Sequence, residues 1–337
     1  MKKQERVIIF SHENDIDGLG NIILGKVAFE EIEYVLASNV NILEAKFRDY
    51  LKKGLLHSYD RIFVTDLALY NPSLEMVSKD SELSKKVLVF DHHRSAINEG
   101  CDRYNFTKIV EIDKNGRKRC GTDLFYEFLY LNGLLTRTKA LDEFVELTRL
   151  EDTWEWKKNE DKGIKAHDLA ILLNGIGLNN YIDSIYAKVI KNEDSFEFIE
   201  NEKKVIDVKK AEYLATLQNI WNDAEFFVDE DENKFAGVFA NYEYRNELGE
   251  YVREINSNDL KYLVVIALEK GAFGQKSYRS IAADFDVGKI AEAHGGNGHP
   301  AAASVNITKE QKEKCLVLRK TSKRDSISYL VNSSYLE

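Results

Sequence analysis

Short, uninterrupted apolar runs alternate with helix-like stretches through the first ninety residues. The apolar runs cover residues 7–10, 32–36, 62–64 and 87–90, and stretches with a helical pattern over 19–31, 41–53 and 73–84 follow the first three. Strands that are apolar throughout are typical of a parallel sheet that is buried on both faces, with helices as the crossover connections. The pattern therefore predicts an α/β fold with a doubly wound, mainly parallel sheet.

The rest of the chain predicts a second, smaller domain. A chain of 337 residues is long enough for two domains. Residues 181–221 are rich in Lys and Glu and contain neither Pro nor Gly, and strand signals resume only after them. We therefore expect an α/β domain over 1–180, a helical connector over 181–221 and an α+β domain over 222–337.

Charge and cysteine content exclude several classes of protein. The chain has 47 Lys and Arg against 57 Asp and Glu, a formal net charge of −10, which argues against a cationic surface for long duplex DNA but leaves a local basic patch open. Cys101, Cys120 and Cys315 are far apart and form no metal-binding or disulfide pattern. Since neither a signal peptide nor a run of about 18 apolar residues is recognised, the sequence predicts a cytoplasmic protein without a membrane partner.

Three of the apolar runs end directly in carboxylates or imidazoles. The first is followed by His12, Asp15 and Asp17, the third by Asp66, and the fourth by the tripeptide Asp91-His92-His93. Because the carboxyl ends of parallel strands meet at one edge of a sheet, these side chains should lie close together. Asp152, just after a predicted helix, is a plausible further member of the group.

Each of these residues also has an ordinary structural interpretation. An Asp at a strand end is often a helix N-cap or turn residue, and a single His can be a buried core residue. A calcium loop around Asp15 and Asp17 is excluded, because aligning Gly18 with loop position six places Leu24 where a bidentate Glu is required. Several carboxylates packed together repel one another unless cations are present. His and Asp ligands without thiolates favour Mn²⁺ or Mg²⁺, with Fe²⁺ and Co²⁺ also suitable.

These residues, taken in order, resemble the four motifs of the DHH phosphoesterase family, which is named after the tripeptide at 91–93. The motifs are His12-x-x-Asp15-x-Asp17, Asp66, Asp91-His92-His93 and Asp152, and they cover about 150 residues. Many family members have three residues between the first His and Asp, whereas this chain has two. The segment around Asp17-Gly18-Leu19-Gly20 and the helical insert are most similar to the nanoRNase B-type oligoribonucleases within the family.

The resemblance implies a two-metal site with Mn²⁺ as the expected ion. One ion would be held by His12, Asp15 and Asp66, and the other by Asp17, Asp66, His92 and Asp152, with Asp66 as the bridge. Asp91 would orient the histidines, His93 would contact the scissile phosphate or assist proton transfer, and Arg94 would help to bind substrate.

A glycine-rich segment near the end of the chain is the second informative motif. The segment Gly295-Gly296-Asn297-Gly298-His299 formally fits a dinucleotide fingerprint, but it follows a helix rather than a strand, and no P-loop Lys follows it. It is either a plain turn or a loop whose amides and His299 bind a phosphate or base. It resembles the glycine motif of the DHH-associated C-terminal domain, and Arg279 resembles that domain's substrate-binding arginine.

The function implied is metal-dependent hydrolysis of short oligoribonucleotides to mononucleotides by a monomer or homodimer. The alternative enzyme is a phosphatase or phosphodiesterase for small nucleotides, such as 3′-phosphoadenosine 5′-phosphate or linearised cyclic dinucleotides. A non-catalytic nucleotide-binding module is the remaining alternative, but it would be expected to lack some of the metal ligands, and every motif position here has a suitable residue.

Overall fold

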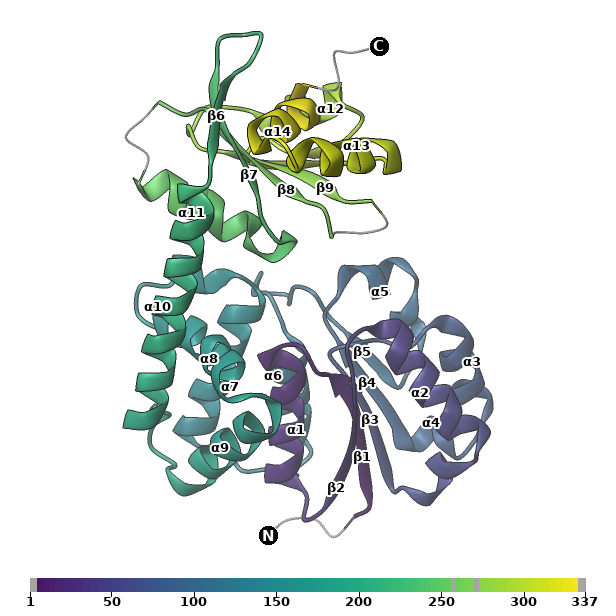
Figure 1. Cartoon of the computed structure of the whole chain (residues 1–337). Helices are drawn as coiled ribbons and strands as arrows, with labels where there is room; N and C mark the ends of the chain where they lie inside the picture. Colours follow the sequence, from purple (N-terminus) through teal and green to yellow (C-terminus); the bar gives the residue numbers. More distant parts are fainter. Residues whose placement is uncertain (1–4, 256–258, 270–272, 333–337) are drawn as a thin grey trace. The chain divides into compact units, whose positions relative to one another are not determined.

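The computed structural model describes residues 5–255, 259–269 and 273–332, and it divides the chain into two compact units (Figure 1). The first unit contains residues 1–209 and the second contains residues 210–337, so that the division falls within the long helix α10 (Glu200–Asn222). No helix among the described residues has the length and apolar character needed to cross a membrane.

The first unit is built on a five-stranded parallel sheet, as the sequence predicts. In spatial order its strands are β2 (Ile32–Ala37), β1 (Val7–His12), β3 (Arg61–Thr65), β4 (Val87–Asp91) and β5 (Thr107–Ile109). All neighbouring pairs are parallel. β5 was not expected from the sequence because its three residues give too short an apolar run to be recognised.

Helices cover both faces of this sheet (Figure 1). One face packs against the helices α1 (Ile16–Ala28) and α6 (Gly121–Leu131). The helices α7 (Lys139–Asp152), α8 (Gly163–Ile176) and α9 (Leu178–Lys191) pack outside α1 and share its core. The other face packs against α2 (Val40–Lys52), α3 (Asn71–Lys79), α4 (Leu83–Lys86) and α5 (Arg94–Asn98). Neighbouring residues of β3 point to opposite faces of the sheet. Phe63 lies in the core on the α1 side, and Ile62 and Val64 lie in the core on the α2 side. This double burial explains the uninterrupted apolar runs.

The strand order changes direction at one point in the sheet. The chain passes from β1 outward to β2 and then returns past β1 to β3, so the direction of winding reverses between β1 and β3. In open parallel sheets, ligands bind beyond the carboxyl ends of the strands at such a reversal. His12 ends β1 and Asp66 follows β3, so both residues lie at this point.

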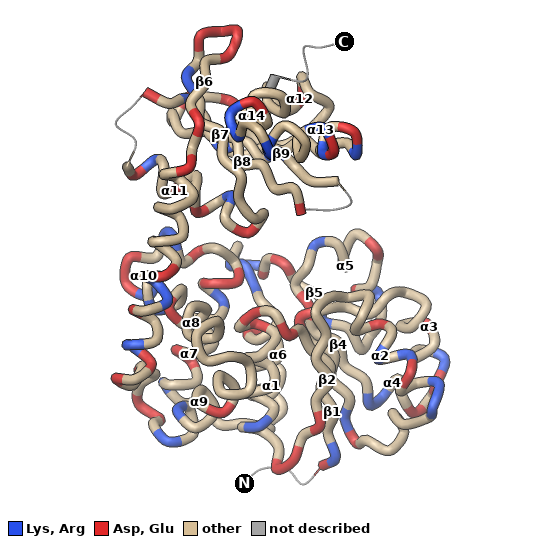
Figure 2. Tube along the Cα trace, viewed as in Figure 1, with Lys and Arg blue, Asp and Glu red and all other residues tan. Residues whose placement is uncertain are grey.

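The segment predicted as a connector consists of two different helices. α9 carries Tyr181, Ile182, Ile185 and Val189 on one stripe, and all four are buried in the core of the first unit. α10 contributes Ile206 to that core and Leu217 to a core of the second unit. Charged residues recur along α9 and α10 (Figure 2). Because of them, the sequence did not reveal the apolar stripe through which α9 packs in the first unit.

The second unit is an α+β structure with a six-stranded mixed sheet. Its spatial order is β10 (Asn297–His299), β11 (Ala302–Asn306), β9 (Gln275–Ser280), β8 (Tyr262–Ala267), β7 (Lys234–Phe239) and β6 (Glu225–Val228). Among the described strands of this second sheet, only β7 and β8 pair in parallel. The second unit has two hydrophobic cores. Helix α11 (Arg245–Ile255) contributes buried residues to one core. Buried residues of α12 (Val287–Ala293), α13 (Lys309–Arg319) and α14 (Lys323–Asn332) belong to the other. The glycine-rich segment, expected to be a loop, is partly the short edge strand β10.

Candidate metal centre

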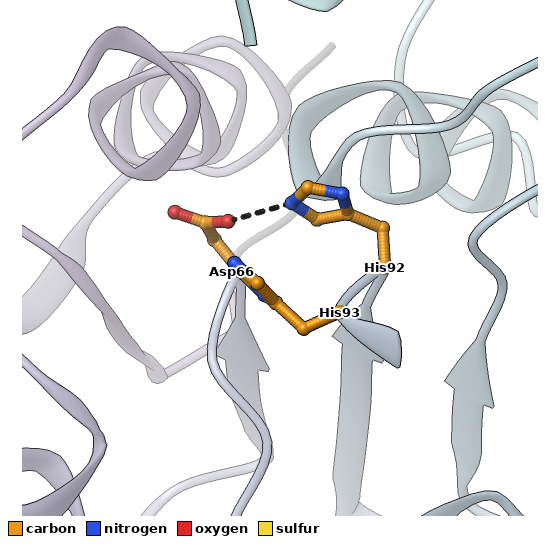
Figure 3. Close-up of side chains that lie close together, drawn as sticks. All are labelled: Asp66, His92 and His93. Carbon is orange, nitrogen blue, oxygen red and sulfur yellow. Dashed lines mark ion pairs between the residues drawn. The ribbon is translucent and has the colours of Figure 1, made fainter. Parts of the chain in front are cut away.

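The predicted side chains converge at the carboxyl ends of β1, β3 and β4. Within this cluster, three groups of residues each bring ligand atoms to within 4.8 Å of one another. They are His12–Asp15–Asp66, Asp17–His92–Asp152 and Asp66–His92–His93. Figure 3 shows Asp66 and His92 extending toward each other from neighbouring strands. Only two residues separate His12 from Asp15, fewer than in many members of the DHH family, but both residues reach the cluster.

The turn between β1 and α1 positions the first three of these residues. Asp15 is the N-cap of α1, and its Oδ1 accepts a hydrogen bond from the backbone N–H of Gly18 at 2.9 Å. A Cβ at Gly18 would clash with the backbone carbonyl of His12. Gly18 is therefore needed for the helix to begin close to the end of β1, and this close approach brings Asp15 and Asp17 beside His12.

His12, Asp15 and Asp66 form the first candidate ligand group. Nδ1 of His12 lies 2.6 Å from Oδ2 of Asp15 and 3.6 Å from Oδ2 of Asp66, and Nε2 lies 3.3 Å from the carbonyl oxygen of Ser38. Burial alone lowers the pKa of His12, but the hydrogen bond to Asp15 and the negative charge of the nearby Asp66 raise it to about 10. A carbonyl partner on the far nitrogen orients the ring, as is usual for a metal-binding His.

Asp17, His92 and Asp152 form the second candidate group. Nε2 of His92 lies 3.6 Å from Oδ2 of Asp17, 3.3 Å from Oδ1 of Asp66 and 3.5 Å from Oδ2 of Asp152. Burial, followed by the charge of Asp17, raises the pKa of Asp152 to about 7. His92 therefore lies at the centre of three carboxylates that come from three different parts of the chain.

Asp66 lies between the two groups and is held in an unusual conformation. It is 1% exposed, and its backbone has a φ of 64°, in the left-handed region that non-glycine residues seldom adopt. Burial and the charges of Asp17 and Asp15 raise the pKa of Asp66 well above its ordinary value. Strain of this kind persists only where the surrounding structure imposes it, and it is concentrated at functional sites.

Asp91 organises the two histidines that follow it. Its Oδ1 accepts hydrogen bonds from the backbone N–H groups of His92 and His93, at 2.7 and 3.2 Å, and lies 2.7 Å from Nδ1 of His93. This hydrogen bond, opposed by burial, raises the pKa of His93. The side chain of His93 is 47% exposed, so that it is the histidine of the pair that solvent and substrate can reach.

The N-terminus of α6 holds Asp17, a feature that the sequence analysis missed. Backbone N–H groups of Gly121 and Thr122 donate to the two carboxylate oxygens of Asp17 at 2.6 and 2.7 Å, and the Thr122 hydroxyl donates to its carbonyl oxygen at 2.6 Å. A Cβ at Gly121 would lie 2.9 Å from Cα of Asp66, so glycine permits this approach. The sequence Cys120-Gly121-Thr122-Asp123 before an apolar helix was the available signal, but it did not identify Asp17 as the partner.

Three buried atoms at the centre of the cluster have no hydrogen-bond partner. They are Oδ2 of Asp66, Nε2 of His92 and Oδ2 of Asp152. Unpaired buried polar atoms are costly and rare in native structures, and carboxylate and imidazole donors at these distances suit divalent ions such as Mn²⁺ and Mg²⁺. The residues present therefore fit a divalent metal site.

Two of the predicted substrate-binding residues of the second unit, Arg279 and His299, share one face of its sheet. His299 pairs with Ala302, and Ala302 pairs with Arg279, so the three lie in one row with side chains on the same face. Two strand spacings, about 10 Å, separate His299 from Arg279. Arg279 is buried and donates to Oδ1 of Asn246 at 2.8 Å from Nη2, and burial lowers its pKa to about 10.

The other predicted residues lie at the surface. Residues 297–299 of β10 are exposed, with Gly295 and Gly296 just before them. Arg94, in the first unit, is exposed at the start of α5, and its Nε lies 3.6 Å from Oε2 of Glu111. These positions leave the glycine-rich segment, His299 and Arg94 accessible to a ligand.

Comparison with known proteins gives one relative with substantial identity. The oligoribonuclease NrnB of Bacillus subtilis (strain 168) is 33% identical over 310 residues, which cover 90% of this chain and 73% of that protein. Among solved structures, the DHH domain of a member of a family of ribosomal proteins matches with a TM-score of 0.50 and 12% identity, over 93% of this chain and 85% of that one. The structural likeness concerns the fold. No family model matches the chain.

Proposed function

The chain belongs to the family of DHH phosphoesterases that includes the oligoribonuclease NrnB, and from this premise we propose that it degrades short oligoribonucleotides to mononucleotides. Members of this family are phosphoric ester hydrolases. The observation that carries the proposal is the convergence of His12, Asp66 and His92 from three strand ends, with unpaired ligand atoms at the centre. That arrangement is suited to binding cations and the phosphate groups that accompany them.

We propose that the two ligand groups hold two divalent ions, of which Mn²⁺ is the best candidate. His12, Asp15 and Asp66 would hold one ion, and Asp17, Asp66, His92 and Asp152 would hold the other. Such ions would supply a water molecule of lowered pKa and neutralise negative charge on the phosphate. Asp66 would serve both ligand groups, because its Oδ2 faces His12 and its Oδ1 faces His92.

The chain's own residues provide orientation and proton transfer. Asp91 holds the ring of His93 through Nδ1, which leaves Nε2 to face the substrate. A carboxylate at this distance favours the protonated imidazole, the form that can donate a proton to a leaving oxygen. His93 would therefore contact the scissile phosphate or supply this proton, while Asp91 positions the ring.

Substrate binding is assigned to both units. Arg94 in the first unit and Arg279, His299 and the segment 295–298 in the second unit would bind phosphate and base groups of a short RNA. Because only a few phosphates need local neutralisation, a net charge of −10 is compatible with such a substrate. We propose that the enzyme acts in the cytoplasm, as a monomer or homodimer, and its three buried free thiols agree with a reducing compartment.

Product analysis with labelled RNA tests this function. RNAs of two to twenty nucleotides are incubated with the protein in Mn²⁺ and, in parallel, with a chelator. We expect mononucleotide products, the highest kcat/KM for the shortest chains and no product with the chelator. Undiminished cleavage with the chelator would exclude metal-dependent hydrolysis. Turnover of 3′-phosphoadenosine 5′-phosphate with no cleavage of dinucleotides would instead support a small-nucleotide phosphatase.

A further inference from the structure

Trp154, which lies two residues after Asp152 in the sequence, has a backbone conformation that is usual for glycine. Helix α7 ends at Asp152, Thr153 is its C-cap, and Trp154 comes next with a φ of 62°. Gly or Asn is usual at this position after a helix because a Cβ is unfavourable in the left-handed region. Tryptophan at this position therefore carries a conformational cost that glycine would avoid.

Burial does not compensate for this cost. Trp154 is 53% exposed, whereas Trp156, two residues later, packs against the core of the first unit and stacks on His167 with ring centroids 4.1 Å apart. Trp156 thus has a clear structural role, and Trp154 has none of comparable size. A large ring that is both conformationally unfavourable and exposed is more readily explained by binding than by folding.

A lysine lies beside the exposed ring. Nζ of Lys157 is 4.9 Å from the ring centroid of Trp154 and 5.4 Å from that of Trp156, and Lys157 is itself exposed. An exposed aromatic face next to a cation is the combination that proteins use for single-stranded nucleic acids, in which the base stacks and the phosphate meets the positive charge.

The backbone that carries Trp154 is held in place. The N–H of Trp154 donates a hydrogen bond to the carbonyl oxygen of Glu151 at 3.1 Å. The carbonyl oxygen of Arg149 accepts hydrogen bonds from the N–H of Thr153 at 3.0 Å and from the Thr153 hydroxyl at 2.8 Å. The ring is therefore attached to the end of a capped helix, which lowers the entropy lost when a ligand stacks on it.

We propose that Trp154 and Lys157 form a stacking platform for the base next to the scissile phosphate. Only Thr153 separates Asp152 from Trp154 along the chain, so that their Cα atoms are at most about 7 Å apart. Asp152 belongs to the proposed metal centre, where the phosphate reacts. The platform rests on the proposed function, since it assigns one of the binding contacts of a short RNA substrate.

The variant Trp154→Gly separates this role from a structural one. Because glycine is favoured at this φ, the melting temperature should stay the same or rise. The KM for the dinucleotide ApA should rise about five- to 150-fold, the range expected for loss of one stacked base, with a smaller change in kcat. Trp154→Phe should recover part of the loss. A melting temperature several degrees lower, with an unchanged KM, would show that Trp154 serves the fold and would overturn the proposal.

Two further measurements keep the platform distinct from the proposed function. An abasic analogue of the dinucleotide should be cleaved equally by wild type and Trp154→Gly, since it has no base to stack. Titration of metal-free protein with ApA should quench tryptophan fluorescence in the wild type but not in Trp154→Gly. Trp221→Phe, which removes a tryptophan of α10, is the control and should be quenched like the wild type. If the wild type cleaves no short RNA, the proposed function fails. If it cleaves RNA while Trp154→Gly behaves identically, only the platform fails.

Discussion

The two units of the chain arrange their polar side chains in opposite ways. In the first unit, residues from three parallel strand ends place carboxylates and imidazoles together in a buried position, and atoms such as Oδ2 of Asp66 have no hydrogen-bond partner. In the second unit, the guanidinium of Arg279 is paired with Asn246 and the backbone of Tyr278, while His299 and its neighbours are exposed. Among the described residues, all three groups able to hold a metal lie in the first unit.

We propose that this difference separates chemistry from recognition. The cluster in the first unit costs folding free energy without cations, because like charges are buried together and Asp66 adopts a left-handed backbone. The second unit carries no comparable cluster in its described part. A structure keeps such a cost where function needs it. We therefore expect reaction to depend on the first unit and the preference among substrates to depend on the second.

The largest effect is expected for Asp66→Asn. The amide cannot serve as an anionic bridge, so that binding of both ions should weaken and kcat/KM should fall by about a thousandfold or more. Metal content and turnover of the folded variant give the measurement. Asp183→Asn, at an exposed position in the same unit, is the matched control and should change neither. Two tightly bound ions with near-normal turnover in Asp66→Asn would remove the distinction between the units.

A smaller and selective effect is expected for Arg279→Ala. Loss of a charged hydrogen-bond donor, worth roughly 1.5–3 kcal/mol, should lower kcat/KM about ten- to two-hundredfold. The loss should be greatest for dinucleotides, and both metals should remain bound. Bis-p-nitrophenyl phosphate, which offers no second nucleotide to hold, should be cleaved almost normally. Arg324→Ala, at an exposed ion pair in the same unit, is the control. Equal loss for both substrates would place Arg279 in the reaction centre.

Thr122→Val tests how the N-terminus of α6 supports Asp17 in the first unit. The substitution keeps the shape of the side chain but removes the hydroxyl that donates to the backbone of Asp17. Loss of a group that supports a ligand typically weakens metal affinity about 10- to 100-fold, so that a Mn²⁺ titration should show about tenfold weaker binding. Thr122→Ser keeps the hydroxyl and should retain wild-type affinity. If Val and Ser variants bind Mn²⁺ equally well, the α6 N-terminus acts through its amides alone.

The smallest effect is the pH dependence of the metal-free protein. The pKa of His12 rises on folding from 6.5 to about 10, so its contribution to stability is complete below pH 6.5 and is lost as the pH rises toward 10. The pKa of Asp152 likewise rises on folding, to about 7, so protonated Asp152 stabilises the fold at low pH. This contribution is lost as the pH rises from about 4 to 7. The melting temperature in chelator should therefore fall by at least about 3 °C from pH 6 to pH 9. A flat or rising profile would contradict these proton affinities.

The sequence predicted the parts of the first unit that depend on local pattern. The apolar runs before His12, Asp66 and Asp91 identified three strands, and the parallel-sheet rule then brought their ends together. β5 and β10 were missed because three-residue strands give little periodicity. Most of the candidate ligands were therefore predictable because they stand at or just after the end of an apolar strand.

Contacts between distant segments were not predictable in the same way. The amides that hold Asp17 come from Gly121 and Thr122, far along the chain, and the sequence contains no local sign of this pairing. The packing of α9 depended on a stripe hidden among charged residues. The left-handed backbone of Asp66 likewise follows from tertiary contacts, since Gly121 must pass close to its Cα.

The most direct test is an anomalous difference map from crystals of the wild-type protein soaked in Mn²⁺. A two-metal centre should give two manganese peaks in the first unit. One should lie among His12, Asp15 and Asp66, and the other among Asp17, Asp66, His92 and Asp152, with an oxygen of Asp66 bound to each. A map with no peak at these side chains, or with Asp66 bound to neither ion, would contradict the two-metal centre.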